Sequence, residues 1–599
     1  MTDKKLKERN QIPDSYKWNI RAMYPDESKW DSDIEECMTR AEKFGCYRGR
    51  LTESASTLLE ALRERDSIWE KLEHAFVYAA MKKDEDNRVD RYQAMNDKCG
   101  SVIARAAAAM SFFSPEIMEA DESVILGYIK EEPGLEQYDF LLRSMLREKD
   151  HVLSAPEENI LAQMSEITGA TSDVFKMLNN ADLDFGEITD EDGDRVTLTH
   201  GNYITFMESG DRKVREEAFT HMYEPYKKLI NTIAVNYNYN TRTDAVSARI
   251  RKYPSSLEAA LDGGNIPVSV YHNLIREVHE YLPVVYRYME LRKRILGVDE
   301  LKMYDIYVPL AAPPEEEIPF EKAVDIMCEA LSPLGGEYTA QLRKGAESGW
   351  IDVYENKGKT SGAYSFGSYD SMPYVLLNYT SSLKDVFTLV HEMGHSMHSF
   401  YTRKTQPYTY GDHSIFTAEV ASTVNESLLI RYLLDTEKDP QMRKYLINYY
   451  IEEFRATLFR QTMFAEFELM THEEIEKGGV LTAGWLNEKY DSLNRKYFGP
   501  ALSEDEYIRY EWARIPHFYR GFYVYQYATG YSAATAISGR ILSEGTPARD
   551  DYIRFLKSGS SDYPVELLKI AGVDMTSPQP VKLAMKTFEN LVDELEKLL

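Results

Sequence analysis

The sequence predicts a mainly α-helical protein of two domains, with a small β-sheet next to a helix that carries paired histidines. Three observations favour this fold. Apolar residues recur at intervals of three and four over most of the chain, and residues 57–82 are a clear example. Residues 182–207 hold two strand-like runs around a turn rich in Asp and Gly. Two further strand-like runs lie within residues 350–380.

The predicted hairpin at 182–207 marks the domain boundary. A chain of 599 residues exceeds what one hydrophobic core normally holds. We expect an N-terminal helical domain over residues 1–200, which ends in the hairpin, and a mainly helical second domain over 201–599. No internal repeat is visible.

The two strands predicted at 362–367 and 372–379 come directly before the paired-histidine helix. Pro373, near the start of the second strand, suits an edge strand whose backbone N–H and C=O groups are free. Such an edge near Tyr374–Tyr379 could bind an extended peptide by strand addition. An ordinary buried sheet agrees equally well with the sequence.

Composition excludes several classes of function. The 70 basic and 98 acidic residues give a net charge of −28, which argues against a nucleic-acid surface. No apolar run approaches the ~18–20 residues of a membrane span. The first ten residues lack the apolar segment of a signal peptide. The four cysteines show no C-x-x-C spacing and fit a reducing cytoplasm. We expect a cytoplasmic protein that binds neither nucleic acid nor membrane, and its oligomeric state stays open.

An H-E-x-x-H array runs from His391 to His395. Residues i and i+4 share one helical face, so the two imidazoles can bind a single Zn²⁺. Glu392 is then placed to take a proton from water that the metal activates. Ser382-Leu383-Lys384-Asp385 has the form of a capping box, and an apolar stripe follows it. We therefore predict His391 and His395 as metal ligands and Glu392 as the catalytic base.

A catalytic zinc needs a third protein ligand. His398 lies two helical turns, ~10.5 Å, beyond His391, which is too far for the same ion, so we expect it to pack or to support a ligand. The next predicted helix offers Glu419 and Glu426 on one face. Spacing alone does not choose between these two carboxylates.

The segment His391–His398, followed 28 residues after His391 by Glu419, resembles the thimet-oligopeptidase-like metallopeptidases, and within them the bacterial oligoendopeptidase F branch. Segments at 9–30, 253–267 and 517–530 extend the resemblance over most of the chain. It implies a large helical zinc metallopeptidase with a deep substrate channel, its catalytic domain at 201–599. It also implies one Zn²⁺ per chain with Glu419 as the third ligand, and cleavage of internal bonds in short, unstructured peptides. Glu426 then becomes an acceptor that orients a ligand histidine.

A Tyr-rich stretch begins at His517, and within it Tyr523 and Tyr527 share a helical face. Taken alone, such a stretch is typical of a packing surface. The resemblance implies that His517, followed by spaced tyrosines, stabilises the oxyanion of the tetrahedral state and binds the substrate backbone. The tyrosine register is offset by one from that of more distant family members.

Two other functions fit the same residues. A zinc carboxypeptidase or dipeptidase on a related helical fold would need a cationic group to bind the substrate C-terminus. A catalytically inactive peptide-binding protein would retain the fold, but the intact Glu392 and the three ligand positions argue against it. The segment His472–Glu476 lacks a second histidine, and we expect it to form a solvated helix.

Overall fold

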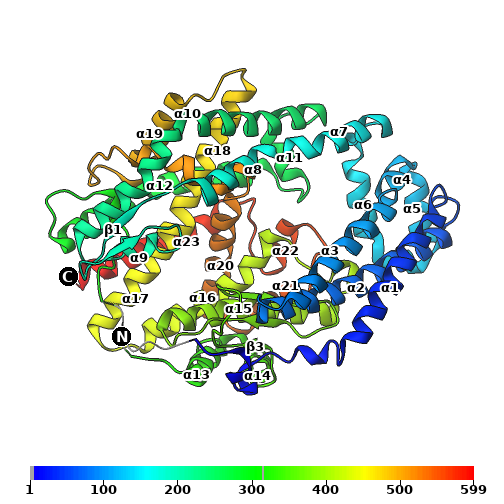
Figure 1. The fold of residues 1–599 in the computed structure, drawn as a ribbon, viewed down its shortest axis with the longest axis horizontal. Helices are drawn as coiled ribbons and strands as arrows, with labels where there is room; N and C mark the ends of the chain where they lie inside the picture. Colours follow the sequence, from blue (N-terminus) through cyan, green and yellow to red (C-terminus); the bar gives the residue numbers. More distant parts are fainter. Residues whose placement is uncertain (1–5, 313, 315, 599) are drawn as a thin grey trace. The chain divides into compact units, whose positions relative to one another are not determined.

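The computed structural model describes residues 6–312, 314 and 316–598 (Figure 1). Helices dominate and only short strands occur, so the predicted fold class is confirmed. The chain divides into two compact units, each built from three separate segments. The first unit comprises 1–150, 315–432 and 537–573, and the second comprises 151–314, 433–536 and 574–599.

The first unit contains eleven complete α-helices among its described residues. These are α1 (Glu27–Lys43), α2 (Ala55–Glu85), α3 (Asp90–Met110), α4 (Phe113–Glu119), α5 (Glu122–Glu131), α6 (Asp139–Arg147), α13 (Phe320–Ala330), α14 (Gly336–Glu347), α15 (Leu383–Thr405), α21 (Thr546–Leu556) and α22 (Pro564–Ile570). The chain passes between the units within α16 (Ile415–Thr436) and α20 (Tyr525–Glu544).

The second unit contains ten complete α-helices among its described residues. These are α7 (Ala155–Thr168), α8 (Ala170–Met177), α9 (Tyr203–Met207), α10 (Arg212–Ile250), α11 (Ser256–Asp262), α12 (Val268–Leu296), α17 (Pro440–Glu453), α18 (Arg460–Glu476), α19 (Ala483–Phe498) and α23 (Gln579–Lys597).

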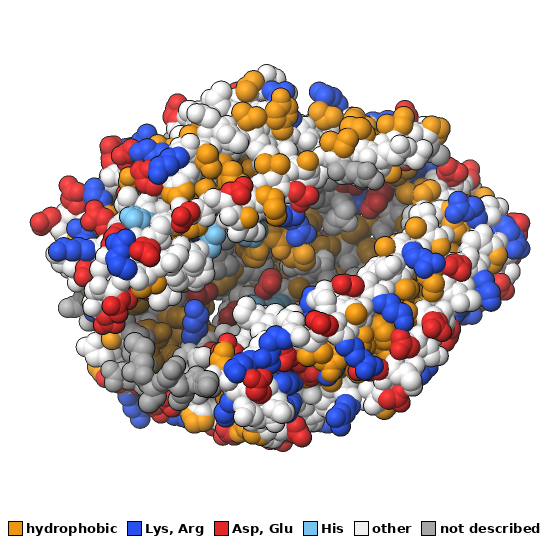
Figure 2. All heavy atoms as spheres, viewed as in Figure 1, with side chains coloured by type: hydrophobic (Ala, Val, Ile, Leu, Met, Phe, Trp, Pro, Cys, Tyr) orange, Lys and Arg blue, Asp and Glu red, His pale blue; other side chains and the backbone are white. Residues whose placement is uncertain are grey.

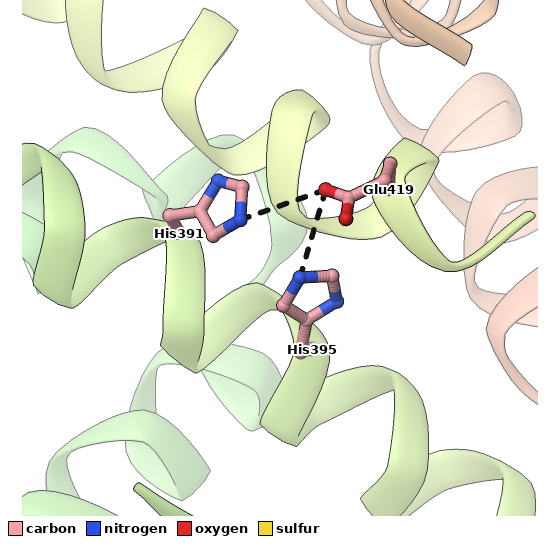
Figure 3. Close-up of side chains that lie close together, drawn as sticks. All are labelled: His391, His395 and Glu419. Atoms are coloured by element: carbon pink, nitrogen blue, oxygen red, sulfur yellow. Dashed lines mark ion pairs between the residues drawn. The ribbon is translucent and has the colours of Figure 1, made fainter. Parts of the chain in front are cut away.

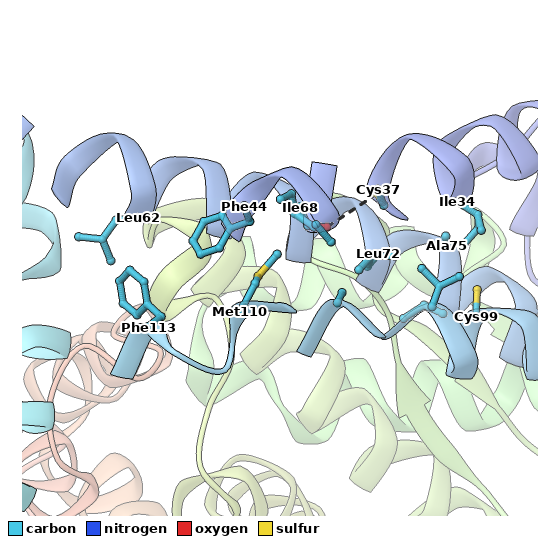
Figure 4. Close-up of a cluster of buried hydrophobic side chains, with 14 of the residues drawn as sticks. Ile34, Cys37, Phe44, Leu62, Ile68, Leu72, Ala75, Cys99, Met110 and Phe113 are labelled. Atoms are coloured by element: carbon cyan, nitrogen blue, oxygen red, sulfur yellow. Dashed lines mark hydrogen bonds between the residues drawn. The ribbon is translucent and has the colours of Figure 1, made fainter. Parts of the chain in front are cut away.

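The predicted helix at 57–82 is confirmed as α2, which contributes many of the side chains in a buried cluster of the first unit. Ser54 caps α2 by accepting the N–H of Thr57. Its buried face packs against α1 and α3, and Figure 4 shows the Cys37 thiol on α1 donating to the carbonyl of Ile68 on α2. The same cluster of buried side chains extends to the sheet residues Tyr374 and Leu376. The sheet beside α15 is therefore anchored to this core.

The predicted hairpin is confirmed. Strands β1 (Glu187–Thr189) and β2 (Arg195–Thr197) pair antiparallel, with Ile188 opposite Val196. The predicted domain boundary lies at this hairpin, whereas the two compact units interleave along the chain. The boundary at residue 200, between an N-terminal domain and a second domain, stays a prediction.

The sheet before α15 has three strands in the order β3 (Ile351–Asp352), β5 (Tyr374–Leu376) and β4 (Tyr364–Phe366). The pairing of β5 is parallel to β3 and antiparallel to β4. The prediction of an edge strand near Tyr374–Tyr379 is wrong, because β5 is the buried central strand. Pro373 gave a misleading signal, since it precedes the strand and needs no ladder hydrogen bond there. The two edge strands of this sheet are β3 and β4.

Charged side chains of both signs are interspersed over the face of the molecule shown in Figure 2. This distribution agrees with a surface that is acidic overall without being built for a polyanion. Within the described part of the chain, no helix combines the length and the apolar character that crossing a membrane requires.

Candidate metal centre and catalytic residues

Helix α15 presents the H-E-x-x-H array from a firmly anchored position. Ser382 and Asp385 form the predicted capping box at its N-terminus. The predicted apolar stripe is buried along the helix (Val386, Phe387, Val390, Met393 and Met397). His391 and His395 consequently project from the opposite side, with their ring centroids 4.9 Å apart.

A glycine lets α16 approach α15 closely. A Cβ on Gly394 would lie 2.6 Å from Cα of Ser422 and 2.9 Å from the carbonyl oxygen of Ala421, so no larger residue fits without moving a backbone. The approach is supported by Asn425, which donates to the carbonyl of Val390 at 3.4 Å. The sequence analysis did not predict this role of Gly394. A glycine inside a strongly predicted helix does, however, indicate that another segment can approach closely there.

The close approach places Glu419 against both histidines (Figure 3). Its Oε2 lies 3.6 Å from Nε2 of His391 and 3.7 Å from Nε2 of His395. Ser422 donates its hydroxyl to the same carboxylate oxygen at 3.2 Å. Among the described residues, these three side chains make up the one group whose ligand atoms could share a metal ion.

The spacing of these atoms fits zinc. A tetrahedral zinc with ligands at about 2.0–2.2 Å separates neighbouring ligand atoms by roughly 3.3–3.6 Å. The two nitrogen–oxygen separations in this group, 3.6 and 3.7 Å, are therefore close to those of a loaded site. Two imidazoles and one carboxylate are also the ligand types that catalytic zinc sites use.

Glu426 contacts the other nitrogen of His391. Its Oε2 lies 3.1 Å from Nδ1, so the two nitrogens of this ring face different carboxylates. Burial lowers the pKa of His391, but the charge and hydrogen bond of Glu426 outweigh burial and raise the pKa to about 9. When the ring is neutral, as a metal ligand must be, a proton held at Nδ1 by Glu426 leaves the lone pair of Nε2 directed towards Glu419.

Glu392 is buried beside this group. Burial raises the pKa of its carboxyl to about 7, an effect that His391 opposes and that Glu419 and Glu426 reinforce. The backbone N–H of Ser365, on β4, lowers the pKa of Glu392 and so lies against its carboxylate. A carboxyl with a pKa near neutrality suits proton transfer in both directions.

His398 does not join the metal group. It is buried and stacks on His413, with ring centroids 4.0 Å apart and an interplanar angle of 12°. Burial lowers the pKa of His398 well below its usual range, so the ring is neutral. The predicted packing role is confirmed, and the stack ties α15 to the segment that leads into α16.

His517, Tyr523 and Tyr527 lie together in the second unit. His517 is in a 3₁₀ turn (Pro516–Tyr519). The centroid of its ring lies 5.9 Å from the ring centroid of Tyr523 and 5.8 Å from that of Tyr527. The hydroxyl of Tyr527 is 3.4 Å from Nε2 of His517. Tyr525 points elsewhere and packs on Tyr271. Burial, with Arg460 and Arg520, lowers the pKa of His517, so the neutral ring can still donate one N–H.

The sequence matches two family models. The model described as Peptidase family M3 covers residues 205–587, and the model described as Oligopeptidase F covers 116–185. The chain belongs to peptidase family M3. The two matches meet between residues 185 and 205, around the hairpin of β1 and β2.

Relatives in this family match the chain over nearly its whole length. Oligopeptidase PepF of Bacillus subtilis is 46% identical, covering 99% of this chain and 89% of its own length. Group B oligopeptidase PepB of Streptococcus agalactiae is 41% identical, covering 98% of both chains. The solved structure of oligoendopeptidase-F from Enterococcus faecium superposes with a TM-score of 0.76 at 40% identity, covering 96% of this chain and 99% of that one. A structure from Chlamydophila abortus reaches 0.93 at 35% identity, covering 99% and 100%.

Proposed function

We propose that this M3 peptidase is a zinc-dependent oligoendopeptidase that hydrolyses internal bonds of short, unstructured peptides. The observation that carries the proposal is the arrangement of His391, His395 and Glu419 around one point, with Glu392 buried beside them. Relatives of this chain, at 46% and 41% identity over almost all of it, are named as oligopeptidases. The four cysteines are free thiols, which supports a reducing cytoplasm as the place of action.

In this proposal His391, His395 and Glu419 hold one Zn²⁺. Bound zinc supplies a Lewis acid that polarises a carbonyl and lowers the pKa of water. Glu392 takes the proton from the attacking water and passes it to the leaving amine. Glu426 accepts from Nδ1 of His391 and thereby fixes the orientation of that ligand.

The edge of β4 that faces away from β5 offers a binding site for the substrate backbone. Val375 donates its N–H to Trp350, on the β3 side, so its partner Ser365 belongs to a non-hydrogen-bonded pair. The backbone groups of Ser365 therefore point away from β5, and its N–H faces the carboxylate of Glu392. An extended peptide that adds to this edge brings its backbone to the catalytic base. Main-chain pairing of this kind gives loose sequence preference.

The oxyanion that forms in the tetrahedral state requires donors. We assign this role to His517 with Tyr523 and Tyr527, which present an imidazole and two hydroxyls within one cluster. The deep substrate channel that the resemblance implies stays a prediction.

The size of the substrate follows from the predicted channel together with strand addition. A channel that admits only a flexible chain would exclude a folded protein, and a peptide can pair with β4 only as an extended chain. We expect cleavage within peptides of roughly 5–20 residues and no cleavage of a stable globular protein. Mass spectrometry of products from a peptide blocked at both ends tests this. A carboxypeptidase or dipeptidase would leave the blocked peptide intact, and rapid digestion of a folded protein would also contradict the proposal.

Replacing the proposed oxyanion donors is expected to slow the chemical step. H517A should lower kcat on the order of 10²-fold with little change in KM, because the lost bond forms mainly in the transition state. Y523F/Y527F should also lower kcat, since it removes both hydroxyls while keeping the rings. Steady-state kinetics and zinc content check this. Unchanged kcat in both variants would exclude the cluster from catalysis.

A further inference from the structure

A backbone bend at Phe522 separates His517 from Tyr523 and Tyr527. Phe522 has φ of 55°, in the left-handed region that residues other than glycine rarely adopt. Such a conformation persists only where the surroundings hold it, and it is concentrated at functional sites. Tyr523 comes directly after the bend, and α20, which carries Tyr527, starts two residues later.

The bend is held by Glu468, a carboxylate on α18. Its Oε1 accepts the N–H of Phe522 at 3.1 Å. Glu468 is completely buried, and its other oxygen, Oε2, has no hydrogen-bond partner within the described residues. Burying a carboxyl oxygen without a hydrogen bond costs folding free energy, so packing alone does not explain a glutamate at this position. Burial raises the pKa of Glu468 well above its usual range, and Asp244 adds to this.

His472 and Asp244 are the other two side chains that surround the bend. The imidazole of His472 lies 2.8 Å from the backbone oxygen of Glu468 through Nδ1 and 3.2 Å from Asp244 Oδ2 through Nε2. The ring of Phe522 packs on His472, with centroids 4.4 Å apart. His472 is buried, so the prediction of a solvated helix is wrong at this residue. The prediction fails because one polar side chain that faces a distant loop does not change the pattern of apolar residues along the helix.

Gly521 shows how closely the backbone of the loop approaches Asp244 and His472. A Cβ at this position would lie 3.0 Å from Asp244 Oδ2 and 3.4 Å from His472 Nε2. The backbone thus passes directly over the His472–Asp244 pair before it turns at Phe522. Three side chains from two helices, α10 and α18, fix the path of the loop.

We propose that Glu468, with the His472–Asp244 pair, is a positioning residue that holds the Gly521–Phe522 bend and so sets Tyr523 and Tyr527 against His517. The inference rests on the proposed function of that tyrosine cluster. Glu468 acts by accepting one backbone N–H, and it does not touch substrate. A neutral amide oxygen can accept the same bond, which makes Glu468→Gln the conservative replacement.

The test compares E468M with E468Q. Methionine has a similar volume but accepts no comparable bond, so E468M should lower kcat on the order of 10–100-fold, as small misplacements of catalytic groups do. E468Q should retain most of the rate. KM and zinc content should stay near wild type in both variants. E473M is the matched control, because Glu473 is exposed on the same helix, where its carboxylate pairs with Lys477 at 2.8 Å.

A double-variant cycle separates positioning from a general loss of structure. In a Y523F/Y527F background, E468M should cost nothing further, because the groups that it positions are already absent. Equal loss in E468M and E468Q, full rate in E468M, or a multiplied loss in the combined variant would overturn the proposal. If E468M does not fold, G521A takes its place in the same cycle, since it disturbs the bend by contact alone. If Y523F/Y527F itself keeps full kcat, the proposed function of the cluster fails, whatever E468M does.

Discussion

E392Q is expected to retain zinc and lose turnover by about 10²–10⁴-fold. Glutamine has nearly the same shape as glutamate but cannot accept the proton of the attacking water. The ligands His391, His395 and Glu419 are unchanged by this replacement, and the new amide can still accept the backbone N–H of Ser365. The loss should therefore appear in kcat, with metal content and thermal midpoint close to wild type.

Metal content is the control for this result. A variant that loses zinc would show that Glu392 supports the ligands instead of acting as the base. A variant with near-normal kcat would exclude it from proton transfer. Single-turnover measurements at saturating peptide confirm that the chemical step, and not product release, is slowed.

E419A is expected to lose zinc far more readily than E426A. Glu419 Oε2 lies within 3.7 Å of Nε2 of both histidines, whereas Glu426 Oε2 lies 3.1 Å from Nδ1 of His391, on the other side of that ring. Removing an outer partner typically costs 10–100-fold in metal affinity, and removing a ligand costs more. Both glutamates are on α16, seven residues apart, so each variant is the control for the other.

Dialysis against a graded series of chelator concentrations, followed by metal analysis, measures this difference. Equal loss from both variants, or readier loss from E426A, would mean that the third ligand is misassigned. E426A should additionally lower kcat if the orientation of His391 matters for catalysis as well as for binding.

The sequence predicted local features well. The capping box at Ser382 and the apolar stripe behind it identified α15, and the Asp- and Gly-rich turn identified the hairpin of β1 and β2. These features depend on neighbours along the chain, which a single sequence displays directly. The choice of edge strand failed because strand order depends on β3, a two-residue strand too short to leave a pattern.

The candidate site was predictable where its chemistry is local. An i,i+4 histidine pair with an adjacent glutamate is visible in any helix. The distinction between Glu419 and Glu426 was not visible, because it depends on where α16 crosses α15. That crossing is set by Gly394, and its effect appears only when both helices are in place. The burial of Glu468 and His472 is likewise invisible to a periodicity argument, since both face a distant loop.

Titration of metal-free protein with zinc, followed by the rate of internal cleavage of an end-blocked peptide, tests the central claim most directly. The account predicts a rate near zero without metal and a linear rise that saturates at one zinc per chain, with no such rise in E419A at the same concentrations. Undiminished cleavage by metal-free wild-type protein, or full recovery of E419A at one zinc per chain, would contradict it.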